Sequence, residues 1–207
     1  MISVTLLGES LAVVDPTDPP LLARSRARDG DLLAVTGPLG GSAAGLRVLA
    51  SNQDRADEEL SAAHLRPTPR VAAGLELVRA GIRCGIDVSD GLVADVGHIC
   101  ERSDVDAEID SKLVPIHPAV TARFPDQALE LALTGGEDYE LVCTGRPADL
   151  ERASDALRAA GQRQLTIIGR IGPRQGERPE VRVLDARGVP MALTRLGYKH
   201  FAMGTSS

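Results

Sequence analysis

Aromatic side chains are scarce in this sequence. Its 207 residues contain two Tyr, two Phe and no Trp. The hydrophobic fraction of 43% and the charged fraction of 25% are still those of an ordinary globular protein. The core must therefore be aliphatic, built from Leu, Ile, Val and Ala. The scarcity also argues against a binder of single-stranded nucleic acid, which needs aromatic rings for base stacking.

Basic residues are outnumbered by acidic ones. The sequence has 23 Lys and Arg against 29 Asp and Glu, a formal net charge of −6. The basic footprint typical of nucleic-acid or anionic-membrane binding is absent. We therefore expect neither as a partner. If the protein handles phosphates, a metal ion must stand between them and its carboxylates.

Cysteines are few, and long apolar runs are missing. Cys84, Cys100 and Cys143 lie far apart, show no C-x-x-C spacing and leave one odd thiol in any disulfide scheme. Zinc and a disulfide framework are both disfavoured. The first residues lack a basic n-region and are interrupted by Glu9, so we expect no signal peptide. A cytoplasmic protein is predicted.

Hydrophobic periodicity predicts alternating strands and helices. The expected strands cover residues 2–7, 31–36, 83–88, 105–109, 138–144, 165–171 and 181–184. The expected helices cover residues 43–50, 70–80, 92–99, 126–132 and 147–160. A Pro-rich stretch, DPTDPP (15–20), fits neither state and is interpreted as a loop. The pattern predicts an α/β or α+β fold whose strand order cannot be read.

The strongest local motif is IDVSDGL (86–92), at a change from strand to helix. Ligands often bind at such points in α/β proteins. Asp87 and Ser89 would project to the same side of an extended segment. Asp90 would sit at the corner beside the first helical amides, a combination that suits magnesium holding a polyphosphate. The alternative is purely structural: Ser89 or Asp90 as an N-cap and Gly91 as a turn.

A second motif is TGGEDYEL (134–141), in which two glycines precede three acids and a tyrosine. Glycines allow the backbone to approach a ligand closely. The alternative is a polar turn leading into a strand. A third motif, TGPLGGS (36–42), can offer amides to an anion but lacks the lysine of a Walker A loop, and a tight turn is the better interpretation.

Three further features are open. GYKHF (197–201) carries rings that either stack on a flat or cationic heterocycle or dock on the domain. RPTPR (66–70) either positions a phosphate or leads rigidly into a helix with solvated charges, the favoured interpretation. The four histidines are scattered without metal-ligand spacing, and we expect them to be surface or core residues.

The order of these motifs resembles the thiamine-monophosphate kinase family. It runs VTGPLG (35–40), RPTPR (66–70), IDVSDGL (86–92), ALTGGEDYEL (132–141), IGRI (168–171) and GYKHF (197–201). The resemblance extends over nearly the whole chain. It implies the C-terminal domain of the aminoimidazole ribonucleotide synthetase-like fold, a mixed sheet packed with helices, and transfer of the γ-phosphate of ATP to thiamine phosphate.

The resemblance also implies roles for single residues. Asp87 and Asp90 would bind Mg²⁺, and Ser89 would contact the nucleotide. Glu137 would contact thiamine phosphate, and Tyr198 would pack on its rings. Such phosphoryl transfer depends on positioning and metal charge rather than on covalent chemistry.

One part of the family pattern has no counterpart here. Family members carry an N-terminal domain with Gly-Asp-Asp and Gly-Gly-Asp motifs, which supplies most of the metal and nucleotide site and the dimer interface. We interpret residues 1–14 as the remnant last strand of that domain, 15–29 as a linker, 30–203 as the C-terminal domain and 204–207 as a tail. The chain alone is expected to be inactive, and a homodimer is expected where the N-terminal domain is present.

Two other functions compete with this interpretation. The first is a non-enzymatic role, in which the chain is a module that binds thiamine phosphate or pairs with a separately encoded N-terminal half of a split kinase. The second is a related enzyme that acts on another phosphate ester, which the GGEDYE and GYKHF motifs disfavour by resemblance.

Overall fold

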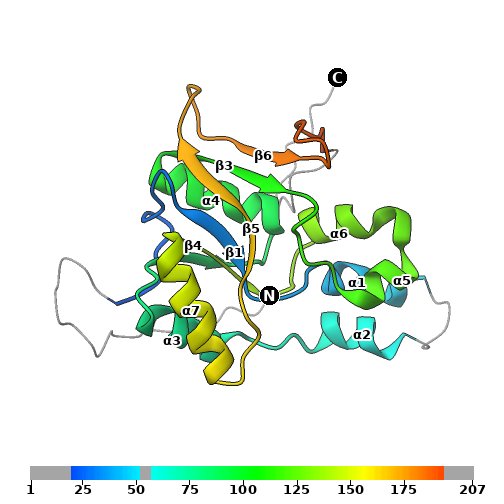
Figure 1. Ribbon diagram of the computed structural model, residues 1–207. Helices are drawn as coiled ribbons and strands as arrows, with labels where there is room; N and C mark the ends of the chain where they lie inside the picture. The colour runs from blue at the N-terminus through cyan, green and yellow to red at the C-terminus, as the bar shows by residue number, and fades with distance from the viewer. Residues whose placement is uncertain (1–19, 52–56, 194–207) are drawn as a thin grey trace, which may run out of the picture.

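A mixed six-stranded sheet with helices on both faces organises the described part of the chain (Figure 1). The computed structural model describes residues 20–51 and 57–193. The elements are β1 (Leu32–Val35), α1 (Gly41–Ala50), α2 (Glu58–Leu65), α3 (Val71–Arg79), β2 (Cys84–Asp87), α4 (Leu92–Ser103), β3 (Val105–Asp110), α5 (Pro118–Arg123), η1 (Pro125–Gln127), α6 (Ala128–Thr134), β4 (Leu141–Gly145), α7 (Pro147–Ala159), β5 (Thr166–Pro173) and β6 (Val181–Leu184). The predicted fold class is confirmed.

The strands lie in the order β2-β4-β1-β5-β3-β6. Every pairing is antiparallel except β3 with β6. In the three strands nearest the β2 edge, Leu32 lies opposite Gly145, and Cys84 lies opposite Thr144. At the other end of the same strands, Val35 lies opposite Val142, and Asp87 lies opposite Leu141. The register therefore gives this half of the sheet two distinct ends.

Both faces of the sheet are buried, which explains why β1 is apolar throughout. Leu33 and Val35 pack on one side with α4, whereas Ala34 packs on the other side with α3 and α7. Successive strand residues point to opposite faces, so a strand covered on both sides needs a continuous apolar run. Burying one leucine side chain in such a core contributes about 1.5–3 kcal/mol.

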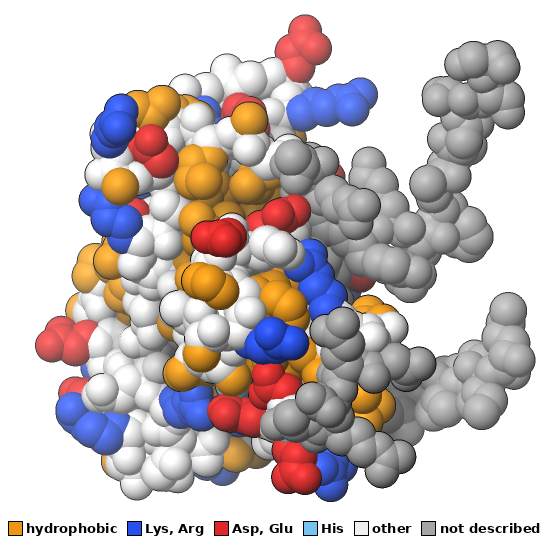
Figure 2. All heavy atoms as spheres, turned by 90° about the vertical axis from the view of Figure 1, so that its right-hand side faces the viewer, with side chains coloured by type: hydrophobic (Ala, Val, Ile, Leu, Met, Phe, Trp, Pro, Cys, Tyr) orange, Lys and Arg blue, Asp and Glu red, His pale blue; other side chains and the backbone are white. Residues whose placement is uncertain are grey.

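A helical lobe lies beside the sheet (Figure 1). Its own apolar cluster comes from α1, α2, α5 and α6, and includes Val48, Leu60, Val120 and Leu131. Helices α1 and α2 approach so closely that a Cβ on Gly45 would lie 2.0 Å from the carbonyl oxygen of Leu60. Figure 2 faces this side of the molecule and shows hydrophobic side chains exposed between acidic and basic ones.

Two helices were not predicted. Helix α2 buries only Leu60, so its sequence shows little periodicity. Helix α5 is short, and Pro118 occupies its first turn. The fixed φ of proline suits that position, where no intrahelical partner for an N–H is needed.

The predicted strand over 138–144 begins three residues late, at Leu141. Glu137 and Tyr139 have φ values of 66° and 51°, which no strand residue adopts. Residues 20–29 of the predicted linker contain no helix or strand, although Ala27 is buried and its N–H donates to Ser103 Oγ. The strand predicted over residues 2–7, and Tyr198, lie outside the described residues.

None of the helices described for residues 20–51 and 57–193 combines the length and the apolar composition needed to span a bilayer.

Candidate functional site

The loop before α4 is held by a carboxylate from inside the helix. Asp95 Oδ2 accepts hydrogen bonds from the backbone N–H groups of Ser89, Asp90 and Gly91 at 3.0–3.1 Å. Gly91 is the N-cap and has a φ of 120°. The interpretation of Ser89 or Asp90 as the N-cap is therefore wrong. Asp95 holds the loop, so the side chains of Ser89 and Asp90 are not needed to cap the helix.

Burial has a marked effect on Asp95. Its side chain is 1% exposed, and desolvation raises its pKa to about 6 despite the three amide hydrogen bonds. The nearby negative charge of Asp90 acts in the same direction.

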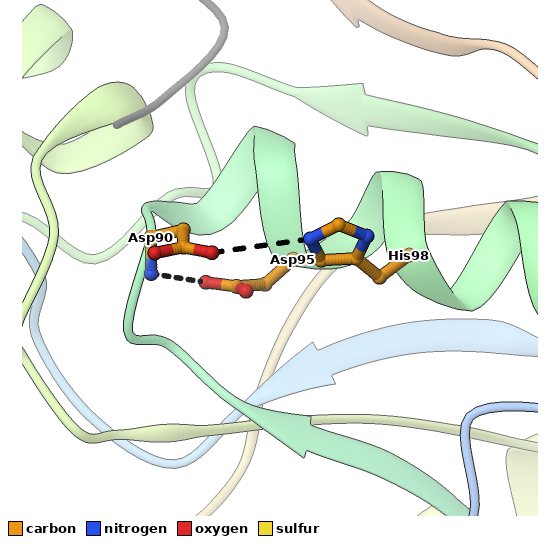
Figure 3. Close-up of side chains that lie close together, drawn as sticks. All are labelled: Asp90, Asp95 and His98. Atoms are coloured by element: carbon orange, nitrogen blue, oxygen red, sulfur yellow. Dashed lines mark hydrogen bonds and ion pairs between the residues drawn. The ribbon is translucent and has the colours of Figure 1, made fainter. Parts of the chain in front are cut away.

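His98 joins these two aspartates, which the sequence analysis missed. Asp90, Asp95 and His98 each place one oxygen or nitrogen within 4.8 Å of the others (Figure 3). His98 Nε2 lies 3.9 Å from Asp90 Oδ2, and its Nδ1 lies 3.8 Å from the carboxylate of Glu101. A spacing of three residues puts Asp95 and His98 on one face of α4, and the helical pattern could have revealed it.

The loop 135–140 packs directly on the loop before α4. The N–H of Glu137 donates to the carbonyl of Ser89, and the N–H of Tyr139 donates to the carbonyl of Val88, both at 2.9 Å. A Cβ on Gly136 would lie 2.5 Å from the Ser89 carbonyl oxygen. The close approach that was predicted toward a ligand is thus made toward the protein's own backbone.

Positive φ values set the direction of the three acids in this loop. Glu137 and Tyr139 both occupy the left-handed region, which costs energy for residues other than glycine. Glu137 is exposed, whereas Asp138 is half-buried and Glu140 is buried. Of the three acids, Glu137 alone is directed to the solvent-accessible side of the loop.

Asp138 holds the glycine loop TGPLGGS (36–42). Its carboxylate accepts hydrogen bonds from the N–H groups of Gly40 at 2.6 Å and Ser42 at 3.0 Å. The loop therefore does offer amides to an anion, and that anion is a side chain of the same chain. Burial raises the pKa of Asp138 to about 6. The structural interpretation of this motif holds.

Glu140 forms a buried ion pair. It accepts hydrogen bonds from Arg70 Nε at 2.9 Å, from Arg70 Nη2 at 2.7 Å and from Thr36 Oγ1 at 2.6 Å. Its side chain is 3% exposed. The prediction of solvated charges in RPTPR (66–70) is wrong for Arg70, because it is the cation that compensates this buried carboxylate.

A cavity of about 700 Å³ opens between these loops and α1. Its lining consists of Ser42, Ala43, Leu46, His64, Ser89, Asp90, Gly136, Glu137 and Tyr139. Three of the predicted site residues, Ser89, Asp90 and Glu137, thus come together. Asp87 does not line this cavity; it is exposed at the end of β2. That Asp87 and Ser89 project to the same side stays a prediction.

Helices α1 and α2 contribute a polar pair to the same cavity. His64 Nδ1 lies 2.9 Å from Ser42 Oγ and 3.5 Å from Glu137 Oε2. His64 was not predicted as a site residue, because α2 was not predicted, and Ser42 was included only as the last residue of the glycine loop. Tyr139 was noted in the sequence as one of few aromatics, and it lies in the cavity wall.

Substituting Gly136 with Ala is expected to destabilise the protein by about 1–3 kcal/mol, because the new methyl group must displace the Ser89 carbonyl. Urea unfolding measures this change. Gly172→Ala is the control, since a Cβ there meets no atom within 4 Å. Equal effects of the two substitutions would contradict the role of close loop packing.

Asp138 should make stability depend on pH. Its pKa of about 6 in the folded state exceeds the ordinary value of 3.8, so the folded state binds the proton more readily. This group therefore lowers stability above pH 6, and the loss is recovered as pH falls from 7 to 5, by about 1 kcal/mol. Asp138→Asn should remove that contribution. Urea unfolding at both pH values, with no difference in slope between variant and parent, would refute the prediction.

Comparison with known proteins identifies the family of this domain. The model for the family "AIR synthase related protein, C-terminal domain" matches residues 28–182. The thiamine-monophosphate kinase of Escherichia coli strain K12 is 39% identical over 193 residues, covering 87% of this chain and 55% of that protein. The chain thus spans about half the length of such relatives.

Solved structures give the same result. The crystal structure of thiamine-monophosphate kinase from Stenotrophomonas maltophilia K279a is 40% identical with a TM-score of 0.69, covering 77% of this chain and 52% of that one. AaThiL complexed with AMPPCP and TMP is 33% identical with a TM-score of 0.71, covering 87% and 54%. The match over residues 28–182 means that this chain belongs to the family of AIR synthase related proteins and contains its C-terminal domain.

Proposed function

We propose that this chain supplies the C-terminal part of a thiamine-monophosphate kinase, which transfers the γ-phosphate of ATP to thiamine phosphate. The observation that carries the proposal is the convergence of Ser89, Asp90 and Glu137 on one cavity from two loops far apart in sequence. The relatives named above and the AMPPCP and TMP complex of AaThiL support it.

Asp90 fits a magnesium ligand. It is half-buried and lines the cavity, and its backbone N–H donates to Asp95, which fixes the backbone from which the carboxylate extends. Magnesium typically uses one or two carboxylates together with phosphate oxygens and water. When bound, the ion would neutralise the charge that the phosphates carry. Asp87 stays a prediction as a second ligand, on the exposed side of the β2 end.

The other residues bind and orient the two substrates. Ser89 lies beside Asp90 at the cavity wall and would contact the nucleotide. Glu137 would contact thiamine phosphate, with His64 3.5 Å from its carboxylate to limit its movement. Tyr198 would pack on the thiamine rings. Loops that are fixed by internal hydrogen bonds, as these two are, reduce the entropy that is lost when two reactants are brought together.

The setting we propose is the cytoplasm. Cys84, Cys100 and Cys143 are buried and free, which suits a reducing compartment.

The test is an assay for thiamine diphosphate by chromatography. The 207-residue chain is compared with a fusion in which the N-terminal part of the E. coli relative precedes it. With ATP, Mg²⁺ and thiamine phosphate, the fusion should form product and the chain alone should form little. A folded fusion that binds AMPPCP but phosphorylates only a different acceptor would contradict the substrate assignment, and robust turnover by the chain alone would contradict its dependence on the other part.

A further inference from the structure

A second cavity lies at the opposite end of the strands that carry the candidate site. It measures about 350 Å³, and the residues lining it are Arg26, Arg28, Asp31, Gly81, Ile82, Arg83, Cys84, Thr144, Gly145, Arg146 and Asp149. Cys84 and Thr144 form the first residue pair of the β2–β4 ladder. Asp87 and Leu141 form its last pair, near the candidate site. Three residue steps along a strand put these two ends about 10 Å apart.

The charge of this cavity is opposite to that of the whole chain. Four arginines and two aspartates line it, a formal excess of two positive charges in a protein of net charge −6. Asp31 is already engaged, because its carboxylate accepts the N–H of Arg28 and the hydroxyl of Thr144. Asp149 pairs with Arg146 and Arg152. These contacts of the two acids do not involve Arg83.

Arg83 is held in place with donor capacity to spare. Its Nη1 donates to the carbonyls of Val78 and Ile82 at 2.8 and 3.0 Å, which fixes the guanidinium at the end of α3. Its Nε is buried and has no hydrogen-bond partner within the described residues. Because Nε has almost no accessible surface, an anion in the cavity would meet the other donors of the Arg83 guanidinium rather than Nε.

Helix α7 adds to the positive electrostatic potential of this cavity. Arg146 is its N-cap residue, so the helix begins at the cavity mouth. The N-terminus of a helix carries a partial positive charge that favours anions. This contribution is secondary to the arginines, which present planar donors matched to phosphate oxygens.

We propose that this cavity binds a small phosphate-bearing anion, either inorganic phosphate or a compact phosphate monoester. Its volume lies at the lower end of ligand pockets and suits a small molecule. The site is separate from the candidate kinase site and does not depend on the proposed function.

The experiment is an NMR titration of the ¹⁵N-labelled 207-residue chain with sodium phosphate at constant ionic strength. Saturable amide shifts are expected at Gly81, Arg83, Cys84 and Gly145. A parallel titration with glycerol phosphate decides the source: tighter binding of the ester assigns the cavity to monoesters, and tighter binding of phosphate assigns it to the free ion. Shifts that do not saturate, or that are confined to residues around Ser89 and Glu137, would overturn the proposal.

Two variants and a matched control complete the test. Arg83→Gln and Arg28→Gln should each weaken phosphate binding by about tenfold, since each removes a charge-assisted hydrogen bond. Arg28 is exposed, so its substitution leaves the fold intact even if Arg83→Gln does not. Arg158→Gln removes the same charge on the exposed side of α7, where Arg158 pairs with Asp155. Equal weakening by Arg28→Gln and Arg158→Gln would overturn the proposal.

Discussion

Asp90→Asn in the fused kinase is expected to reduce thiamine diphosphate formation by at least about 100-fold. Asn keeps the shape of the side chain and the backbone N–H that donates to Asp95, so the loop stays in place. The substitution removes the charge that holds a cation against the transferred phosphate. Loss of one such group from a preorganised site typically lowers kcat by 10²–10³.

The dependence of the rate on Mg²⁺ makes this prediction specific. Asp90→Asn should raise the Mg²⁺ concentration needed for half-maximal rate, which a purely structural defect would not do. Glu101→Gln is the matched control, because Glu101 also lies near His98 but is exposed on the far side of it. Retention of activity within threefold by Asp90→Asn would show that Asp90 is not a ligand.

Much of the fold was predictable because its elements are local. The short apolar run of β1 and the apolar faces of α4 and α7 follow from the local sequence pattern alone. The strand order was not predictable, because pairings such as Leu32 with Gly145 join residues more than 100 positions apart. Nothing in a local pattern specifies such a partner.

The candidate site was predictable in its parts but not in its assembly. Ser89, Asp90 and Glu137 were singled out from two motifs, and only the resemblance connected those motifs. Ser42 and His64 enter the cavity from α1 and α2, so they required the packing of the helical lobe to be known.

The acids of GGEDYE illustrate why composition alone misleads. Three acids within four residues suggested a ligand-binding turn, yet Asp138 accepts hydrogen bonds from the amides of the glycine loop and Glu140 pairs with Arg70. The positive φ values at Glu137 and Tyr139 break the alternation that a strand would impose. Most of this motif therefore builds the loop, and Glu137 is left to face the cavity.

Arg70→Met is expected to destabilise the protein by about 3–5 kcal/mol, since it leaves the buried carboxylate of Glu140 without its cation. The space around this carboxylate is tight: a Cβ on Gly37 would lie 2.3 Å from Glu140 Oε1. Water therefore has little room to replace the guanidinium. The free energy of urea unfolding measures the loss.

A second substitution separates the lost charge from the lost packing. In Arg70→Met/Glu140→Leu the buried charge is gone, so the double variant should be more stable than Arg70→Met alone. Arg158→Met is the exposed control and should change stability by less than about 0.5 kcal/mol, because its partner Asp155 is also solvated. If the double variant were no more stable than Arg70→Met, the cost would lie in packing at Arg70. The position of this ion pair also connects it to the candidate site. Glu140 directly precedes β4 and accepts a hydrogen bond from Thr36 at the start of the glycine loop. The ion pair therefore joins two segments that contribute residues to the cavity.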